Sequence, residues 1–176
     1  KKAEREARKL GWNPVLSHAH QASLHMGSGG GAILARSGTG IAPAPQGMVP
    51  EAMEHRLHLA WIDAVVKGGI SAFNVYLKDS EGLSDTTLAL LEAAATCLNA
   101  LEGPWIAAGD WNITPKVLAS SNWLKIVDGV IFATQLPTCH QSTYDFFVVH
   151  RSMAHAVVAV QRLEDGGLFP HYPSRL

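Results

Sequence analysis

The chain has 176 residues, of which 47% are hydrophobic and 16% are charged, and its formal net charge is −1. This composition excludes an intrinsically disordered chain, which combines low hydrophobicity with a high net charge. It also excludes binding of nucleic acid through bulk charge, so any such contact must be local. The length suits one domain or a fragment of a larger one, and we expect residues 1–176 to form a single domain.

The two cysteines and the apolar runs bear on the compartment. Cys97 and Cys139 are too few for a disulfide framework and stand in no Cys-x-x-Cys zinc motif. They favour a reducing environment, and the charged start of the chain is unlike a signal peptide, so we expect an intracellular protein of the cytoplasm or nucleus. No apolar run approaches the roughly 20 residues of a membrane span, and we expect no membrane partner.

The N-terminal part of the chain is predicted to hold one helix and one strand. Residues 3–10 carry apolar side chains at helical spacing and are followed by Gly11, a typical C-terminal cap. A glycine-rich stretch at 27–31 leads into a short apolar run at 32–35, which favours a buried strand. Residues 37–50 are rich in glycine and proline and are predicted to be a loop.

A β-hairpin is predicted in the middle of the chain. Residues 56–66 begin with alternating apolar and polar side chains, which places Leu57, Leu59 and Trp61 on one face of a strand. A Lys-Gly-Gly turn separates them from a second apolar run at 70–77, and this arrangement is typical of two paired antiparallel strands.

The second half mixes helices and strands. Ser84 or Asp85 is the expected cap of a helix that runs to Gly103, and a fully apolar strand follows at 105–108. A Thr-Pro pair after that strand predicts the start of a short helix, and two more strands are expected near 130–134 and 144–149. Because strands and helices do not alternate strictly, the pattern favours an α/β sandwich with mixed or antiparallel pairing.

The first candidate site follows the strand at 105–108. Asp110 and Asn112 stand two residues apart, and in extended geometry such residues point to the same side. Asp110 can then accept a proton from water or bind a hard cation, while Asn112 orients the same water or an oxyanion. The alternative is a polar turn at the end of the strand, because Asp and Asn are common turn residues.

Three other residues are candidates for the same chemistry. Asp145 precedes four apolar residues, so its carboxylate needs a partner such as a histidine, unless it only caps the strand. His171 is held between Pro170 and Pro173, which suits either a contact with phosphate or a rigid surface loop. Tyr76 ends an apolar strand, where a tyrosine is usually part of the core with its hydroxyl bonded at the edge.

The nine histidines raise the alternative of a zinc site. The pairs His18-x-His20 and His55-x-x-His58 have suitable spacing, but zinc sites need three or four converging ligands. His55 and His58 are expected on opposite faces of a strand, and the other pair is expected in a loop. Ordinary surface histidines are therefore favoured over a zinc site.

Taken together, the segments around Tyr76, Asp110, Asp145 and His171 resemble the endonuclease/exonuclease/phosphatase superfamily, also called deoxyribonuclease-I-like, in order and spacing. The Pro-Thr-Cys sequence that begins at Pro137 is most similar to the nuclease-like proteins of retrotransposons. The resemblance covers nearly all of the chain after its first few residues. It implies a four-layer α/β sandwich of two mixed β-sheets with outer helices.

The resemblance also implies hydrolysis of phosphodiester bonds in nucleic acid with Mg²⁺ or Mn²⁺, as in an endonuclease of a mobile element. Asp110 would position and deprotonate the attacking water, and Asn112 would hold that water and the scissile phosphate. These two residues would also be the metal ligands. Tyr76 would donate a hydrogen bond to a phosphate oxygen. His171 would stabilise charge on the pentavalent phosphate, and Asp145 would orient His171.

The chain departs from the family pattern in two respects. The family's first two strands bring an Asn and a metal-binding Glu, and this chain begins inside the helix that follows them, so we expect a truncated domain. Pro170 stands where the family has an Asp before the final histidine. The metal site of Asp110 and Asn112 is therefore expected to be incomplete. Two alternatives stay open: an inactive remnant or binding module of the same fold, and a phosphatase of small phosphoesters.

Overall fold

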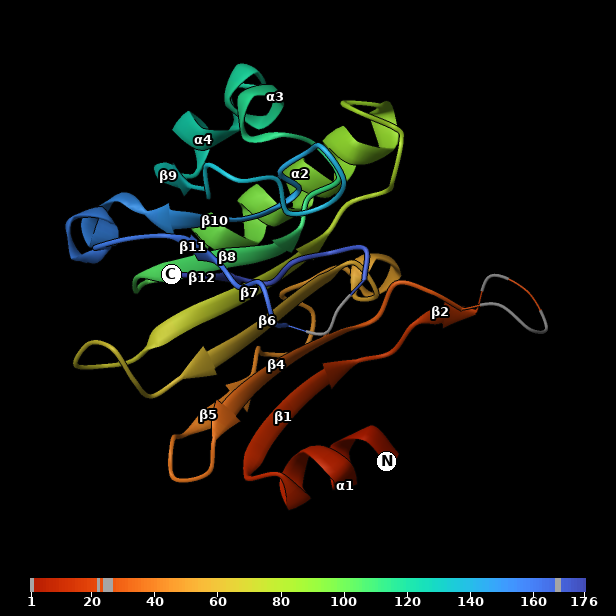
Figure 1. The fold of residues 1–176 in the computed structure, drawn as a ribbon. Helices are drawn as coiled ribbons and strands as arrows, with labels where there is room; N and C mark the ends of the chain where they lie inside the picture. Colours follow the sequence, from red (N-terminus) through yellow and green to blue (C-terminus); the bar gives the residue numbers. More distant parts are fainter. Residues whose placement is uncertain (1, 22, 24–26, 167–168) are drawn as a thin grey trace.

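A computed structural model describes residues 2–21, 23, 27–166 and 169–176 (Figure 1). Its largest element is a six-stranded sheet, with helices on one side and a smaller strand pair on the other. In chain order the elements are α1 (Lys2–Lys9), β1 (Trp12–Ser17), β2 (His20–Gln21), β3 (Gly27–Ser28), β4 (Gly31–Arg36), β5 (Ile41–Pro43), a 3-10 turn (Glu51–Met53), β6 (Leu57–Ile62), β7 (Ile70–Tyr76), α2 (Asp85–Asn99), β8 (Trp105–Asp110), α3 (Pro115–Ser120), α4 (Trp123–Ile126), β9 (Gly129–Phe132), β10 (Asp145–His150), a second 3-10 turn (Arg151–Ala156), β11 (Gln161–Arg162) and β12 (Ser174–Arg175).

The six-stranded sheet has the order β5-β6-β7-β8-β10-β9. All neighbouring strands are antiparallel except β7 and β8, which are parallel and are joined by α2. The predicted hairpin is confirmed by β6 and β7, which pair with Leu57 opposite Val75. The mixed pairing that the sequence favoured is therefore confirmed.

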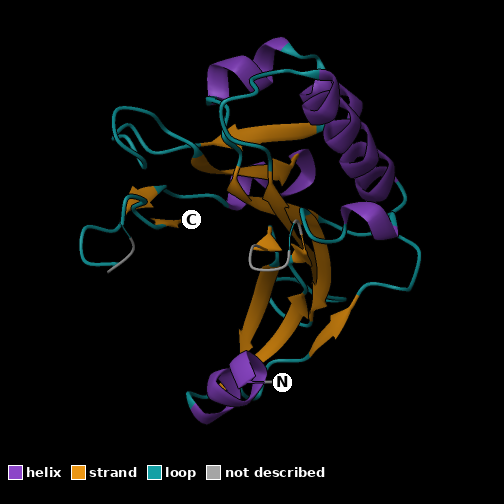
Figure 2. Ribbon diagram, turned by 90° about the vertical axis from the view of Figure 1, so that its right-hand side faces the viewer, coloured by secondary structure: helices purple, strands orange, loops and turns teal. Residues whose placement is uncertain are grey.

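Helix α2 covers one side of this sheet, as Figure 2 shows. It begins at the predicted cap, where the Ser84 side chain accepts a hydrogen bond from the Thr87 N–H. Leu90, Leu91 and Leu98 are almost fully buried against the sheet, and each contributes about 1.5–3 kcal/mol to stability. This helix therefore fixes the crossover that brings the ends of β7 and β8 together.

The opposite side of the sheet carries a second layer. β1 and β4 form an antiparallel pair that lies against β6, and Ile33 and Ala35 of β4 are buried there. The predicted α/β architecture is confirmed. The second layer, however, is this two-stranded antiparallel pair rather than a mixed sheet in the part of the chain that the structure describes.

The prediction for residues 37–50 is wrong in part. The expected loop at 37–50 contains β5, which adds a short edge strand to the sheet. Trp61 shares the predicted face of β6 with Leu57 and Leu59, but it lies near the end of the strand, where its indole N–H donates to the Gly68 carbonyl (3.1 Å) and its ring is 39% exposed. Cys97 and Cys139 are free and both are buried. None of the helices in the described ranges has the length and apolarity needed to cross a membrane.

Candidate active site at the ends of three strands

Strand register brings three of the predicted site residues into one row. β7 and β8 run in parallel, so they end at the same edge of the sheet, and Tyr76 lies opposite Asp110. β10 runs the other way, so its first residue, Asp145, lies opposite Asp110 on the other flank. The three residues therefore lie side by side on adjacent strands, at the end of the sheet where β7 and β8 finish and β10 begins.

A close approach of β7 and β8 precedes Asp110. Gly109 has a φ of +148°, and a Cβ atom at this position would lie 2.0 Å from the carbonyl oxygen of Val75. Only glycine fits between the two strands without moving them. The glycine before Asp110 is thus a requirement of the sheet.

Asn112 reaches Asp110 through a turn. The strand ends at Asp110, and Asn112 has a φ of +47° in the left-handed region, where Asn is tolerated. Its side-chain amide donates to Asp110 Oδ2 (3.1 Å) and to the Leu77 carbonyl (3.0 Å), and its backbone N–H donates to Asp110 Oδ1 (3.2 Å). The two residues lie together as predicted, but a turn brings them together rather than strand alternation.

His171 pairs with Asp145. The His171 Nδ1 atom lies 2.8 Å from Asp145 Oδ2, and the other ring nitrogen, Nε2, lies 4.0 Å from Asp110 Oδ2. A carboxylate at Nδ1 favours the tautomer with hydrogen on that nitrogen. Nε2 is thereby presented to the space beside Asp110.

Thr138 positions the start of β10 and was not recognised as part of the site from the sequence. Its side chain is fully buried, and Oγ1 accepts hydrogen bonds from the backbone N–H groups of Tyr144 and Asp145, both at 2.9 Å. Its carbonyl accepts from the N–H of Tyr172, the residue after His171. A single threonine therefore links the two segments that carry Asp145 and His171. The only sequence signal was its place in the Pro-Thr-Cys segment.

Burial sets the electrostatics of the site. Burial, followed by the neighbouring charge of Asp145, raises the pKa of the Asp110 carboxyl above its ordinary value. The His171 ring and the N–H groups of Asn112 act in the opposite direction and only partly offset this rise. A carboxylate with a raised pKa is a stronger base than an exposed one.

The donor atoms suit a hard cation that is shared with a substrate. Asp110, Asp145 and His171 each offer a ligand atom within 4.8 Å of the others. Because Asp145 Oδ2 and His171 Nδ1 engage each other, the Asp110 carboxylate and the side-chain oxygen of Asn112 are the oxygen atoms left for a cation. Mg²⁺ is commonly held by one or two carboxylates together with substrate phosphates, and this set fits that pattern. Pro170, beside His171, has no ligand atom on its side chain.

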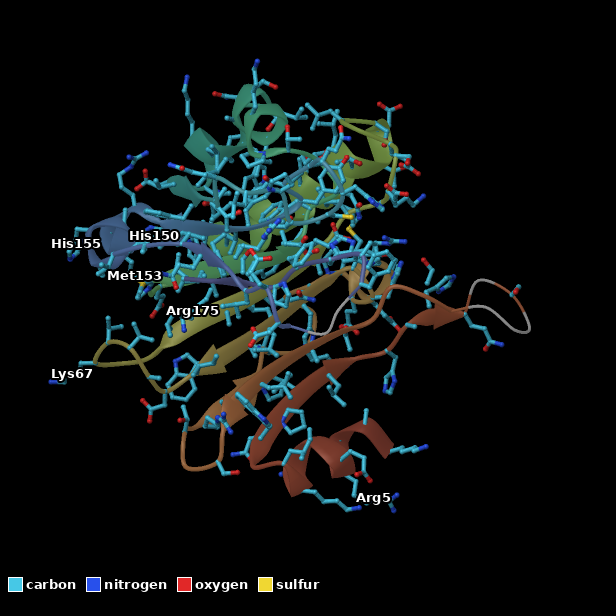
Figure 3. All side chains as sticks on the ribbon, in the orientation of Figure 1. Arg5, Lys67, His150, Met153, His155 and Arg175 are labelled. Carbon is cyan, nitrogen blue, oxygen red and sulfur yellow. The ribbon has the colours of Figure 1, made fainter. Side chains whose placement is uncertain are left out.

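The other histidines lie elsewhere. The predicted placement of His55 and His58 on opposite faces of one strand is wrong, because His55 lies in the turn before β6. Both line one cavity of about 520 Å³ together with His18 and His20. His150 and His155 lie at the other end of the sheet from Asp145 (Figure 3). Among the described residues, no three of these histidines converge on one point as zinc ligands do.

Comparison with known proteins gives matches of structure only. No family model matches the chain, and no curated protein matches its sequence. A 3′-5′ exonuclease from Neisseria meningitidis is 19% identical, with a TM-score of 0.67 over 99% of this chain and 82% of that chain. The endonuclease domain of TRAS1, a telomere-specific non-LTR retrotransposon, is 14% identical, with a TM-score of 0.68 over 98% of this chain and 87% of that chain.

An AP endonuclease from Leishmania major is a third similar structure, 16% identical, with a TM-score of 0.65 over 98% of this chain and 73% of that chain. At these identities the likeness concerns the fold. It agrees with the resemblance drawn from the segments around Tyr76, Asp110, Asp145 and His171. The chain therefore has the fold of the deoxyribonuclease-I-like, or endonuclease/exonuclease/phosphatase, superfamily.

Proposed function

We propose that this protein hydrolyses phosphodiester bonds in nucleic acid, with a divalent cation as cofactor. The observation that carries the proposal is the arrangement of Asp110, Asn112, Asp145 and His171 at one edge of the sheet, with His171 Nδ1 2.8 Å from Asp145. The nuclease activities named for the similar structures support the same reaction class.

Each residue has a role that its contacts support. Asp110, a base strengthened by burial, accepts the proton of the attacking water, and Asn112 orients that water through its bonded amide. His171 presents Nε2 to the charge that develops on phosphate, while Asp145 fixes its ring. Tyr76, opposite Asp110, donates its hydroxyl to a phosphate oxygen. A bound Mg²⁺ or Mn²⁺ would neutralise phosphate charge and polarise the phosphoryl oxygen.

Nicking of supercoiled plasmid tests the proposal. With Mg²⁺ or Mn²⁺ present, Asp110→Asn should lower the cleavage rate at least about a hundredfold, because the general base and a cation ligand are lost while the shape is kept. Chelation of divalent cations should abolish cleavage by the wild type. Asp128→Asn is the matched control, since Asp128 is exposed and pairs with Arg151 away from the site. Equal rates for wild type and Asp110→Asn would refute the proposal.

An inactive binding module is the second candidate. It is favoured by Pro170, which supplies no ligand where an acidic residue would complete the cation site. In that case the wild type would cut no plasmid, and calorimetry would detect no Mg²⁺ binding that depends on Asp110. Saturable Mg²⁺ binding that Asp110→Asn removes would count against this candidate.

Two finer points belong to the same proposal. A phosphatase role is favoured by one similar structure, which is described as a 3′ phosphatase bound to a product DNA hairpin. Faster release of phosphate from a 3′-phosphorylated oligonucleotide than nicking of plasmid would favour that role.

Origin from a mobile element is supported by the likeness to the TRAS1 domain. A reverse-transcriptase frame beside the coding sequence would test it.

A further inference from the structure

Arg56 lies behind the candidate site and contacts it through several atoms. Its guanidinium carbon is 4.8 Å from the centre of the Tyr76 ring, which is the geometry of a cation–π contact. Its Nη1 group donates to the carbonyls of Tyr76 and Leu77, both at 3.4 Å, and its Nη2 group donates to Ser28 Oγ at 2.7 Å. The side chain thus spans from β3 to the end of β7.

The Leu77 carbonyl connects Arg56 to Asn112. This oxygen accepts from Arg56 and also from the Asn112 side-chain amide, at 3.0 Å. The backbone N–H of Leu77 donates to the Asp110 carbonyl (3.1 Å), and that of Tyr76 donates to the Arg56 carbonyl (2.8 Å). A shift of Arg56 would therefore move the tyrosine ring and the carbonyl that orients Asn112.

The partners of Arg56 differ from those of three other arginines. Arg8, Arg151 and Arg162 each pair with a carboxylate. Among the described residues, no carboxylate pairs with Arg56, whose donors go to two backbone carbonyls and a hydroxyl. Most of the contacts of Arg56 are with Tyr76 and Leu77, next to the candidate site.

We propose that Arg56 is a positioning residue of the hydrolytic site. It holds the Tyr76 ring by stacking and fixes the Leu77 carbonyl, which in turn orients Asn112. This role requires a planar group with several donors, which Arg has and Lys lacks. The inference rests on the proposed function for its kinetic consequence, whereas its structural consequence can be measured without catalysis.

Arg56→Lys tests this role because it keeps the charge and removes the planar fork. We expect kcat for plasmid nicking to fall about tenfold or more, as misplaced groups cost catalysis steeply. KM and its salt dependence should stay nearly unchanged. Arg36→Lys is the matched control, since Arg36 also stacks on an aromatic ring, Trp12 at 4.0 Å, far from the site. Ser28→Ala removes one acceptor of Arg56 and should lower kcat in the same direction by a smaller factor.

A second readout does not depend on turnover. The chain has three tyrosines, so Tyr76 ring signals can be assigned in NMR spectra by Tyr76→Phe. Arg56→Lys should shift the Tyr76 ring and Asn112 side-chain amide signals and leave Tyr144 unmoved. If the wild type is inactive but these signals move, the proposed function fails and the positioning role stands.

Two results would overturn the positioning role. One is a kcat for Arg56→Lys within about twofold of the wild type, which would mean that charge alone matters. The other is an unchanged Tyr76 and Asn112 spectrum in the Lys variant. Should Arg56→Lys not fold, Ser28→Ala decides by the same two measurements.

Discussion

Asp110 is placed where its carboxylate is useful for catalysis but where its negative charge destabilises the folded protein. It is mostly buried beside a second carboxylate, and burial raises its pKa. Within the part of the chain that the structure describes, both N–H groups that donate to its carboxylate belong to Asn112, the residue two positions later. The site therefore keeps a charge in a place that disfavours it, which is typical of catalytic positions.

The cost can be measured as a pH-dependent difference in stability. Because the folded protein holds the Asp110 proton to a higher pH than the unfolded chain, stability falls as pH rises from the ordinary pKa through the raised one. Asp110→Asn lacks this loss. Its free energy of unfolding relative to wild type should therefore rise from acid to neutral pH. Urea denaturation at several pH values checks this, and a difference independent of pH would contradict it.

At the scale of elements, the segment before β10 determines where Asp145 lies. Thr138→Val keeps the shape of the side chain but leaves the N–H groups of Tyr144 and Asp145 without their acceptor. We expect a loss of about 1–3 kcal/mol in the free energy of unfolding, measured by denaturation. Thr138→Ser retains the hydroxyl and should stay near the wild type. A Thr138→Val variant as stable as the wild type would contradict the role of the hydroxyl.

Local signals in the sequence predicted much of the fold. Some features depend only on residues that are close together in the chain, so the sequence predicts them. They are the helix caps at Ser84 and Thr114 and the hairpin of β6 and β7. β5 was missed because it forms only against β6, through three residues that read as a loop. Trp61 keeps its predicted face of β6, and its indole N–H donates to the Gly68 carbonyl at the turn.

The arrangement of the candidate site was harder to predict from the sequence, for a related reason. Asp110 and Asp145 stand at strand ends, which alternation and composition indicate, and the histidine partner expected for Asp145 is His171 in the structure. Their assembly depends on strand register, which a single sequence does not reveal. The roles of Thr138 and Arg56 come from contacts between residues that are far apart in the chain, and no recognised motif around either residue predicts its role.

At the scale of the whole molecule, charge limits how nucleic acid can bind. The net charge is −1, and basic side chains such as Arg5 and Lys67 lie away from the site (Figure 3). Arg56 lies nearer, because its guanidinium contacts the Tyr76 ring and the Leu77 carbonyl, and Lys78 directly follows Leu77 in the chain. Nucleic acid would therefore meet few cations.

This distribution predicts a weak dependence of binding on salt. If duplex DNA binds with about two phosphates neutralised, the logarithm of the affinity should fall with the logarithm of salt concentration with a slope of about −2. Fluorescence anisotropy with Asp110→Asn, which should bind without cutting, measures the slope. A slope steeper than about −5 would reveal a wide cationic surface instead.

The order of the six-stranded sheet has a consequence for how copies of the chain meet. Its outermost strands are its shortest: β5 has three residues and ends in Pro43, and β9 has four. Proline cannot donate to a neighbouring strand, and short strands give little length for pairing. The long strands β7 and β8 are enclosed between them. The sheet that carries the candidate site is thereby protected at its edges against growth into intermolecular β-aggregates.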